Sequence, residues 1–303
     1  MDVNVKITVL GAGAIGSLWA VALKQQQHDV QVWTRSSNPE YSVNYQALNG
    51  NPQPFIFTAN SIEHLSQSDL LLVTVKSFQV EMALAPIINQ IPDSCIIVIM
   101  HNGIGSQEII KQQLPTHDIL YATTSQAALK SEELLRHTGN GQTFIGAIQT
   151  NTPRDFSTIA DLLDQVLTPC KWRTDIMQPL WQKLAINCAI NPLTAINQCP
   201  NGELAQAQYQ SQLKQICNEV ALVMTAEGYK TTAQTLYEQA LMVIHATANN
   251  YSSMNRDVFY QRQTEIDYIT GYLIRRAKQY DIAVPANQQL WQRIKSMESS
   301  YHA

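Results

Sequence analysis

The sequence of 303 residues predicts an α/β protein in two parts, a doubly wound sheet domain over residues 1–174 and an all-helical domain over residues 175–303. Two observations support this prediction. The first half alternates short apolar strands with helical stretches, and the strands expected at 69–75 and 95–100 are continuous apolar runs, as is typical of parallel strands buried on both faces. Beyond about Thr174, the long segments all show helical periodicity.

The expected elements of the N-terminal part alternate between strand and helix. Residues 6–10 form the first predicted strand, residues 15–26 the helix that it feeds, and residues 29–34 the second strand. Between residues 119 and 148 the helical pattern disappears, and Gly139-Asn140-Gly141 predicts a tight turn between two short strands. We expect this stretch to be an antiparallel extension at the edge of the sheet.

The C-terminal helices carry recognisable signals at their ends. Gly228 suits a helix C-terminus, Thr231 or Thr232 an N-cap, and Pro285 the first turn of a helix. The predicted helices cover residues 178–197, 203–227, 233–249, 265–280 and 286–299.

The composition argues against two classes of partner. A net charge of −4 provides no basic field for nucleic acid or for an anionic membrane. No apolar stretch approaches the roughly 20 residues that span a bilayer. The apolar run 5–10 leads directly into a glycine-rich loop, which is not the pattern of a secretory leader. We therefore expect a cytoplasmic protein with a small-molecule substrate and with no nucleic-acid or membrane partner, either a monomer or a homodimer.

Cysteine and histidine show no metal-ligand spacing. The five cysteines form no CxxC pair and are odd in number, which favours a reducing compartment over a disulfide framework or a zinc site. The seven histidines contain no HxxxH spacing, so we predict no metal.

A glycine-rich loop joins the first predicted strand to the first helix. Gly11, Gly13 and Gly16 have the G-x-G-x-x-G spacing. The first glycine allows a sharp turn, the second lets backbone N–H groups approach a pyrophosphate, and the third lets the helix pack closely on the strand. The start of the helix adds partial positive charge. This context predicts a Rossmann-type dinucleotide-binding domain, and the alternative is a tight strand–helix turn without a ligand.

The end of the second strand predicts which dinucleotide binds. An Asp or Glu there would bond the ribose 2′-hydroxyl of NAD, but this chain has Arg35, whose guanidinium suits a 2′-phosphate. A charge-assisted contact of roughly 1.5–3 kcal/mol would favour NADPH by about ten- to a hundredfold. The alternative is a solvated surface arginine.

Polar candidates follow two later strands and line one helix. Lys76 and Asn102 come directly after predicted strands, at the carboxyl ends where ligands bind in open α/β sheets. Lys183, Asn187 and Asn191 recur at i, i+4 and i+8, so they share one face of an otherwise apolar helix. A buried polar stripe needs partners, and a ligand can supply them.

Two acidic residues lie in the first turn of the fourth predicted helix of the C-terminal part. Glu265 and Asp267 have two compatible interpretations, as functional carboxylates or as first-turn residues that favour the helix dipole.

Taken in order, these motifs resemble the ketopantoate reductase (2-dehydropantoate 2-reductase) family. The resemblance covers essentially the whole chain, and the Lys183 and Glu265 elements are far more specific than the glycine loop. The matching stretches are the glycine loop, the basic end of the second strand, Lys76 with Gln79, and residues 101–103, 183–187, 191–195, 199–203 and 264–267.

The resemblance implies NADPH-dependent reduction of 2-dehydropantoate to (R)-pantoate, in pantothenate and hence coenzyme A synthesis. It implies that Lys183 is the general acid that protonates the keto oxygen, and that Glu265 helps to bind substrate and positions the lysine. The implied substrate contacts are Asn102, Asn187, Asn191, Asn201 and Ser253, the serine with the substrate carboxylate. The implied cofactor contacts are Gly11, Gly13, Ala14, Ile15, Gly16, Arg35, Lys76, Gln79, Asn102, Ala128 and Glu265. Gln126 and Ala127 depart from the His or Gly that many members have there, so no role is assigned to residue 126.

The implied chemistry is coherent in physical terms. A ketone that accepts a hydride becomes an alkoxide, and a neighbouring ammonium can stabilise this charge and deliver the proton. Burial should lower the pKa of Lys183 and Glu265 should raise it, and the sequence does not say which effect is larger. Two alternatives remain: another NADP-dependent 2-keto or 3-hydroxy acid dehydrogenase of similar fold, or a non-catalytic NADPH sensor.

Overall fold

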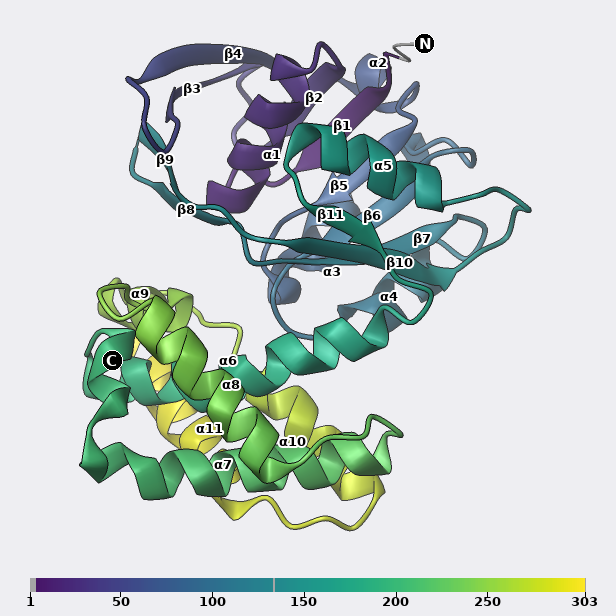
Figure 1. Cartoon of the computed structure of the whole chain (residues 1–303). Helices are drawn as coiled ribbons and strands as arrows, with labels where there is room; N and C mark the ends of the chain where they lie inside the picture. Colours follow the sequence, from purple (N-terminus) through teal and green to yellow (C-terminus); the bar gives the residue numbers. More distant parts are fainter. Residues whose placement is uncertain (1–3, 133, 303) are drawn as a thin grey trace. The chain divides into compact units, whose positions relative to one another are not determined.

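The computed structural model describes residues 4–132 and 134–302. The chain divides into two compact units (Figure 1). The first unit extends to Ile176 except for residues 102–105, which belong with the helices from Met177 onward in the second unit.

Within residues 4–132 and 134–176, the first unit is built on a single sheet of 11 strands. Its central block is parallel throughout, and β1 lies in the middle with later strands added on both sides. Strand order reverses at β1, so ligands are expected at the carboxyl ends of the strands here. The block contains, in spatial order, β4 (Gln53–Ala59), β2 (Asp29–Trp33), β1 (Lys6–Leu10), β5 (Leu70–Val73), β6 (Ile96–Met100) and β7 (Ile119–Thr124).

The four strands predicted within this block are confirmed, with differences of up to two residues at their ends. β5 ends before the predicted residue 75 because Thr74 turns toward the glycine loop. Its N–H donates to the carbonyl of Leu10, and its hydroxyl donates to the carbonyls of Leu10 and Gly11. β5 and β6 are buried at nearly every position, as expected for strands covered on both faces.

A long antiparallel ribbon extends the sheet beyond β7. Its near half pairs β7 with β10 (Thr143–Gln149), and its far half pairs β8 (Ala127–Lys130) with β9 (Leu134–Gly139). β9 also pairs with β3 (Glu40–Gln46) at the other end of the sheet, and the far half packs on α1 (Ala14–Gln25) (Figure 1). The ribbon therefore passes over α1 and the loop that precedes it.

The expected antiparallel extension is confirmed, but the expected turn at Gly139-Asn140-Gly141 is not a hairpin turn. These residues join β9 to β10, which do not pair with each other. A Cβ at Gly141 would lie 2.1 Å from the carbonyl carbon of Ser125. The glycine is needed because the two sides of the ribbon approach closely there.

Several elements of the first unit are not among those predicted. The antiparallel pair β3–β4 carries alternating aromatic residues, and α5 (Ser157–Val166) precedes the edge strand β11 (Cys170–Trp172). The remaining elements are α2 (Ile62–Leu65), η1 (Ser77–Gln79), α3 (Val80–Leu84), η2 (Ile88–Gln90) and α4 (Ser106–Gln113).

The second unit is helical and is organised around α6 (Met177–Asn197), against which the later helices pack. α6 buries Trp181, Leu184, Cys188 and Leu193, which explains why its sequence is apolar on most of its circumference. The other elements are η3 (Asn201–Ala205), α7 (Ala207–Ala226), α8 (Ala233–Ala246), α9 (Ser253–Phe259), α10 (Thr270–Gln279), α11 (Pro285–Ser299) and η4 (Ser300–His302).

The predicted helix ends are confirmed. Gly228 follows α7 with φ of +90°, the Thr232 hydroxyl caps α8 by accepting from the N–H of Thr235 at 3.0 Å, and Pro285 starts α11. Among the described residues, no helix has the length and apolar character that crossing a bilayer requires.

Two predicted helices begin later than expected: α7 starts at Ala207 rather than at residue 203, and α10 starts at Thr270 rather than at residue 265. The N–H groups of Tyr268 and Ile269 both donate to the carbonyl of Glu265, which closes a separate turn, and α10 starts at Thr270. Glu265 and Asp267 therefore lie in this turn and not in the first turn of a helix.

Candidate active site

The glycine loop has the geometry that its sequence pattern predicts. Gly11 has φ of +112°, a conformation that favours glycine, and its N–H donates to the carbonyl of Trp33 at 3.0 Å. A Cβ at Gly16 would lie 2.0 Å from the carbonyl oxygen of Gly11 and 2.3 Å from the Thr74 hydroxyl. Because glycine has no Cβ, Gly16 can lie this close to Gly11 and Thr74, and α1 can start immediately against the end of β1.

Gly13 differs from its two neighbours because a Cβ there would meet no protein atom within 4 Å. Gly13 is the N-cap of α1, makes no side-chain cap, and precedes a first turn without acidic residues. The first N–H groups of a helix, here those of Ala14 and Ile15, have no partner within the helix and carry partial positive charge. This open cradle fits a pyrophosphate.

Lys130 and Tyr41, which were not predicted as site residues, contact the glycine loop and the start of α1. Lys130, from β8, donates to the carbonyl of Ala12 at 2.6 Å and lies 4.8 Å from the ring centroid of Tyr41. The Tyr41 hydroxyl in turn shares a 2.7 Å hydrogen bond with Ser17 on α1. The sequence gives no signal for Lys130, because only the path of the ribbon over α1 brings it to the loop.

Four other predicted cofactor contacts, Arg35, Lys76, Gln79 and Ala128, belong to the first unit. β5, β1 and β2 are neighbours, so the loops that follow them, which carry Lys76, the glycines and Arg35, leave the sheet side by side. Arg35 is exposed, and its guanidinium has no hydrogen bond or ion pair within residues 4–132 and 134–302. Gln79 ends η1 after Lys76, and Ala128 packs against the apolar cluster beside the glycine loop.

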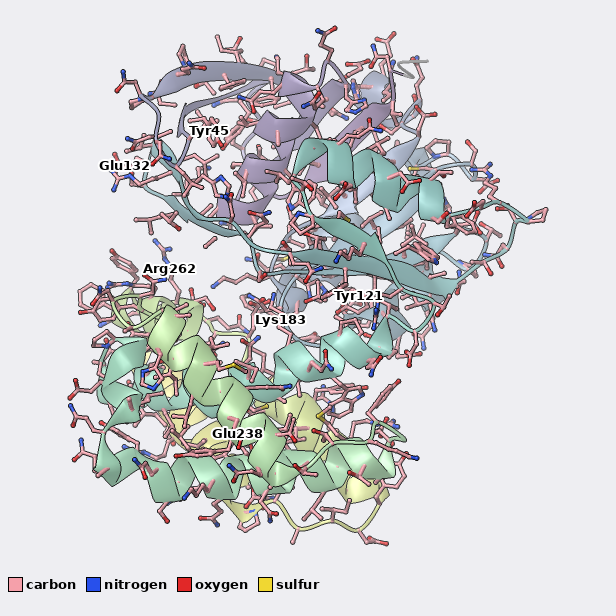
Figure 2. The ribbon with its side chains drawn as sticks, viewed as in Figure 1. Tyr45, Tyr121, Glu132, Lys183, Glu238 and Arg262 are labelled. Carbon is pink, nitrogen blue, oxygen red and sulfur yellow. The ribbon has the colours of Figure 1, made fainter. Side chains whose placement is uncertain are left out.

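In the second unit, Lys183, Asn187 and Asn191 share one face of α6, as expected from their spacing. Lys183 and Asn187 are partly buried, and Asn191 is buried. Figure 2 shows Lys183 on this helix. The side-chain amides of the two asparagines have no hydrogen-bond partner in the described part of the chain, so a ligand can provide one.

Glu265 is held by a loop that comes from far away in the sequence. The amide of Asn102 donates to the Glu265 carboxylate at 3.3 Å, and the N–H of Ile104 donates to the carbonyl of Tyr268 at 2.8 Å. Gly103 has φ of +81°, and a Cβ there would lie 2.5 Å from the Tyr268 carbonyl oxygen. Only glycine allows the two backbones to approach this closely.

The Glu265 turn is also fixed to α11. The Glu298 carboxylate accepts from the N–H and the hydroxyl of Thr264 at 2.8 and 2.7 Å. Lys295 forms ion pairs with Glu298 at 3.0 Å and with Asp267 at 2.9 Å. Residues on both sides of Glu265 are therefore anchored, which limits the positions that its carboxylate can take.

Burial and the charge of Glu265 act in opposite directions on the pKa of Lys183, and the structure indicates which effect is larger. Burial lowers the pKa of Lys183 to about 8, although the Glu265 carboxylate acts to raise it. The effect of burial is therefore the larger. An ammonium with this pKa releases its proton near neutral pH far more readily than an ordinary lysine.

The remaining two predicted substrate contacts lie near the C-terminal end of α6. Asn201 is buried, donates to the Thr247 hydroxyl at 2.9 Å, and has a buried Oδ1 without a partner among the described residues. Ser253 is an exposed residue in the first turn of α9. Its neighbour Ser252 is hydrogen-bonded to Thr194 at 2.8 Å, which ties α9 to α6.

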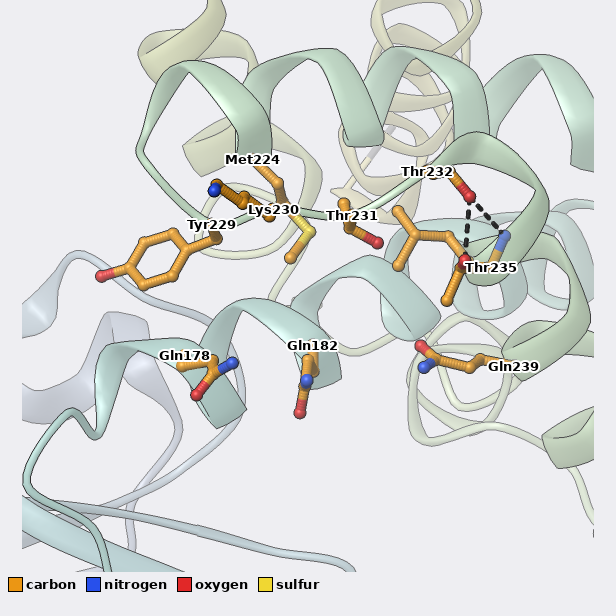
Figure 3. Close-up of a pocket in the computed structure, with 10 residues that line it drawn as sticks. Gln178, Gln182, Met224, Tyr229, Lys230, Thr231, Thr232, Thr235 and Gln239 are labelled. Carbon is orange, nitrogen blue, oxygen red and sulfur yellow. Dashed lines mark hydrogen bonds between the residues drawn. The ribbon is translucent and has the colours of Figure 1, made fainter.

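A separate pocket of about 370 Å³ lies between the start of α6, the end of α7 and the start of α8 (Figure 3). None of the predicted site residues lines it. Its walls carry Gln178, Gln182, Met224, Tyr229, Lys230, Thr231, Thr232, Thr235, Leu236 and Gln239. Within the described residues, no group of three His, Cys, Asp or Glu side chains could hold a metal ion.

Comparison with known protein families covers both parts of the chain. The family model described as "Ketopantoate reductase PanE/ApbA" matches residues 7–150, and the model described as "Ketopantoate reductase PanE/ApbA C terminal" matches residues 175–298. The chain belongs to the ketopantoate reductase family.

This ketopantoate reductase family member is similar to curated proteins over nearly its full length. It is 43% identical over 297 residues to the 2-dehydropantoate 2-reductase of Vibrio cholerae, covering 97% of this chain and 98% of the relative. Among solved structures, it resembles a PanE/ApbA family ketopantoate reductase from Ralstonia eutropha with a TM-score of 0.87 at 22% identity, covering 98% and 99% of the two chains. It also resembles a D-mandelate dehydrogenase solved with NADH and anilino(oxo)acetate, with a TM-score of 0.89 at 24% identity and the same coverage. These two structures support the fold.

Proposed function

We propose that the protein reduces 2-dehydropantoate to (R)-pantoate with NADPH, as a step of pantothenate and coenzyme A synthesis. The observation that carries this proposal is the arrangement of Lys183 and Glu265, in which burial lowers the pKa of the lysine to about 8 against the opposing effect of the carboxylate. The substrate agrees with the names of the curated relatives, and the choice of NADPH rests on Arg35, the basic residue after β2.

Lys183 acts as the general acid. NADPH, when bound, supplies a hydride to the keto carbon of the substrate. Lys183 then delivers its proton to the keto oxygen, so that the product is an alcohol and the lysine is left neutral until it regains a proton from water. With a pKa of about 8, roughly nine tenths of this lysine is protonated at pH 7.

Glu265 keeps the lysine in its protonated form and holds it in place. Its negative charge favours the ammonium, and its own position is fixed by Asn102 and by the turn that α11 anchors. Positioned proton transfer contributes about 10²–10⁴ in rate, which sets the size of the effect expected from Lys183.

The unpartnered amides of α6 bind the substrate. Asn187 and Asn191 lie on the face of α6 that carries Lys183, so they can bond the hydroxyl and carboxylate groups of a small acid. The buried Oδ1 of Asn201 is suited to accept from a substrate hydroxyl or to orient another contact. Ser253 offers a hydroxyl to the substrate carboxylate.

The first unit binds NADPH. The cradle at Gly13 takes the pyrophosphate, and Arg35 takes the 2′-phosphate. Lys76, Gln79 and Ala128 line the remaining length of the dinucleotide.

The test is an absorbance assay of NADPH oxidation in the presence and absence of 2-dehydropantoate. We expect oxidation only with this substrate, and we expect Lys183→Ala to lower kcat by about 10²–10⁴ with nearly unchanged NADPH affinity. A higher kcat/KM for another 2-keto acid in a substrate panel would favour the alternative dehydrogenase. NADPH binding without turnover of any member of the panel would favour a sensor.

A further inference from the structure

The loop that follows β2 is held by the side chain of Asn60, which lies directly after the neighbouring strand β4. β4 ends at Ala59, and Asn60 directly after it adopts a left-handed backbone conformation with φ of +57°. This conformation is unfavourable for most residues and is tolerated best by Gly, Asn and Asp. Asn60 is therefore placed with its amide toward residues 34–38, the loop that carries Arg35.

The Asn60 amide satisfies the backbone of this loop at several points. Its Oδ1 accepts from the N–H of Thr34 at 2.8 Å, and its Nδ2 donates to the carbonyl of Ser36 at 2.7 Å. The same Nδ2 donates to the carbonyl of Asn38 at 3.0 Å and has a longer contact of 3.3 Å with the Thr34 hydroxyl. One side chain thus replaces the regular hydrogen bonding that the loop lacks.

The two residues that flank Arg35 are both fixed in this way. Thr34 is held through its N–H and Ser36 through its carbonyl, so the backbone on each side of Arg35 has a defined position. The Arg35 side chain itself is exposed and has no hydrogen bond or ion pair in the described chain. Its direction is therefore set by the backbone beneath it.

We infer that Asn60 is a positioning residue for cofactor selection: it orders the Arg35 loop in advance, so that the guanidinium meets the 2′-phosphate of NADPH without a further ordering cost. The inference rests on the proposed preference for NADPH. Ordering a loop before binding raises affinity because the entropy of ordering is not lost on association. NADH has no 2′-phosphate, so its binding does not depend on Arg35 and should not depend on Asn60.

The experiment measures kcat/KM for NADPH and for NADH in the wild type, Asn60→Gly, Asn60→Ser and Arg35→Ala. Asn60→Gly keeps the left-handed backbone without strain and removes only the amide. Asn60→Ser replaces the amide by a short neutral hydroxyl, so it adds no charge beside the cofactor site. Gln27→Gly is the matched control, because Gln27 is an exposed residue of the same unit with φ of +64°.

We expect Asn60→Gly to lower the NADPH/NADH ratio of kcat/KM by about three- to tenfold, through KM for NADPH and with unchanged kcat. Asn60→Ser should lower the ratio as well, and Gln27→Gly should leave it unchanged. Equal losses with both cofactors, or an unchanged ratio in Asn60→Gly while Arg35→Ala lowers it, would overturn the inference alone. An unchanged ratio in Arg35→Ala would overturn the proposed role of Arg35 and this inference with it, and a wild-type ratio below one would overturn the proposed NADPH preference. If Asn60→Gly does not fold, the ratio in Asn60→Ser decides.

Discussion

The amide of Asn102 donates a 3.3 Å hydrogen bond to the carboxylate of Glu265, although 163 residues separate them in the chain. This bond fastens the loop after β6 to the turn before α10, and Gly103 permits the backbones to meet there. Because the carboxylate is held, its effect on the pKa of Lys183 is a fixed feature of the site. The consequences of this arrangement can be measured.

Removing the charge of Glu265 should lower the pKa of Lys183 further. The carboxylate acts to raise this pKa, so in Glu265→Gln the lysine should lose its proton below pH 8. The high-pH limb of the kcat/KM profile should therefore move to lower pH than in the wild type. Glu238→Gln, at an exposed position of α8 (Figure 2), is the control and should leave the profile unchanged. An unshifted limb in Glu265→Gln would show that this carboxylate has no influence on the catalytic proton.

The anchor on α11 should matter for stability and for turnover. Glu298→Ala leaves the buried N–H and hydroxyl of Thr264 without their acceptor, which costs about 1–3 kcal/mol in the free energy of unfolding. We also expect a loss of kcat, because the turn that carries Glu265 is released. Glu298→Gln retains an oxygen for Thr264 and should lie between the wild type and Glu298→Ala. Denaturant unfolding and steady-state kinetics check the two effects, and full activity in Glu298→Ala would contradict the proposed anchoring.

The glycine loop offers a matched pair of substitutions. Gly16→Ala would place a Cβ 2.0 Å from the Gly11 carbonyl oxygen, so we expect a clear fall in Tm without any ligand. Gly13→Ala would place a Cβ in open space, so the protein should remain close to wild-type stability while its NADPH affinity falls. Thermal unfolding of the free protein and fluorescence titration with NADPH separate the two. Wild-type NADPH affinity in Gly13→Ala would contradict a pyrophosphate at this position.

Local signals in the sequence were sufficient for much of the fold. The apolar runs at β5 and β6, the cap at Thr232 and the polar face of α6 each depend on neighbours within one element. The turn at Glu265 was predicted as helix because its hydrogen bonds depend on Thr264 and on α11, which no helical period reveals.

Such local signals do not predict which strands pair when they lie far apart in the sequence. The ribbon passes over α1 and pairs β9 with β3, and this path alone brings Lys130 to the glycine loop. Asn60 follows β4, which was not predicted, so the sequence did not indicate its contact with the Arg35 loop either.

If Lys183 delivers the proton, the pH dependence of kcat/KM for 2-dehydropantoate with saturating NADPH follows the titration of this lysine. A general acid acts only when protonated, and this form is lost as the pH rises through a pKa of about 8. We predict a constant value below that pH and a fall of about tenfold per pH unit above it, absent from the residual activity of Lys183→Ala. A profile that stays flat to about pH 10, the range of an ordinary lysine, would rule out proton delivery by a lysine with this lowered pKa.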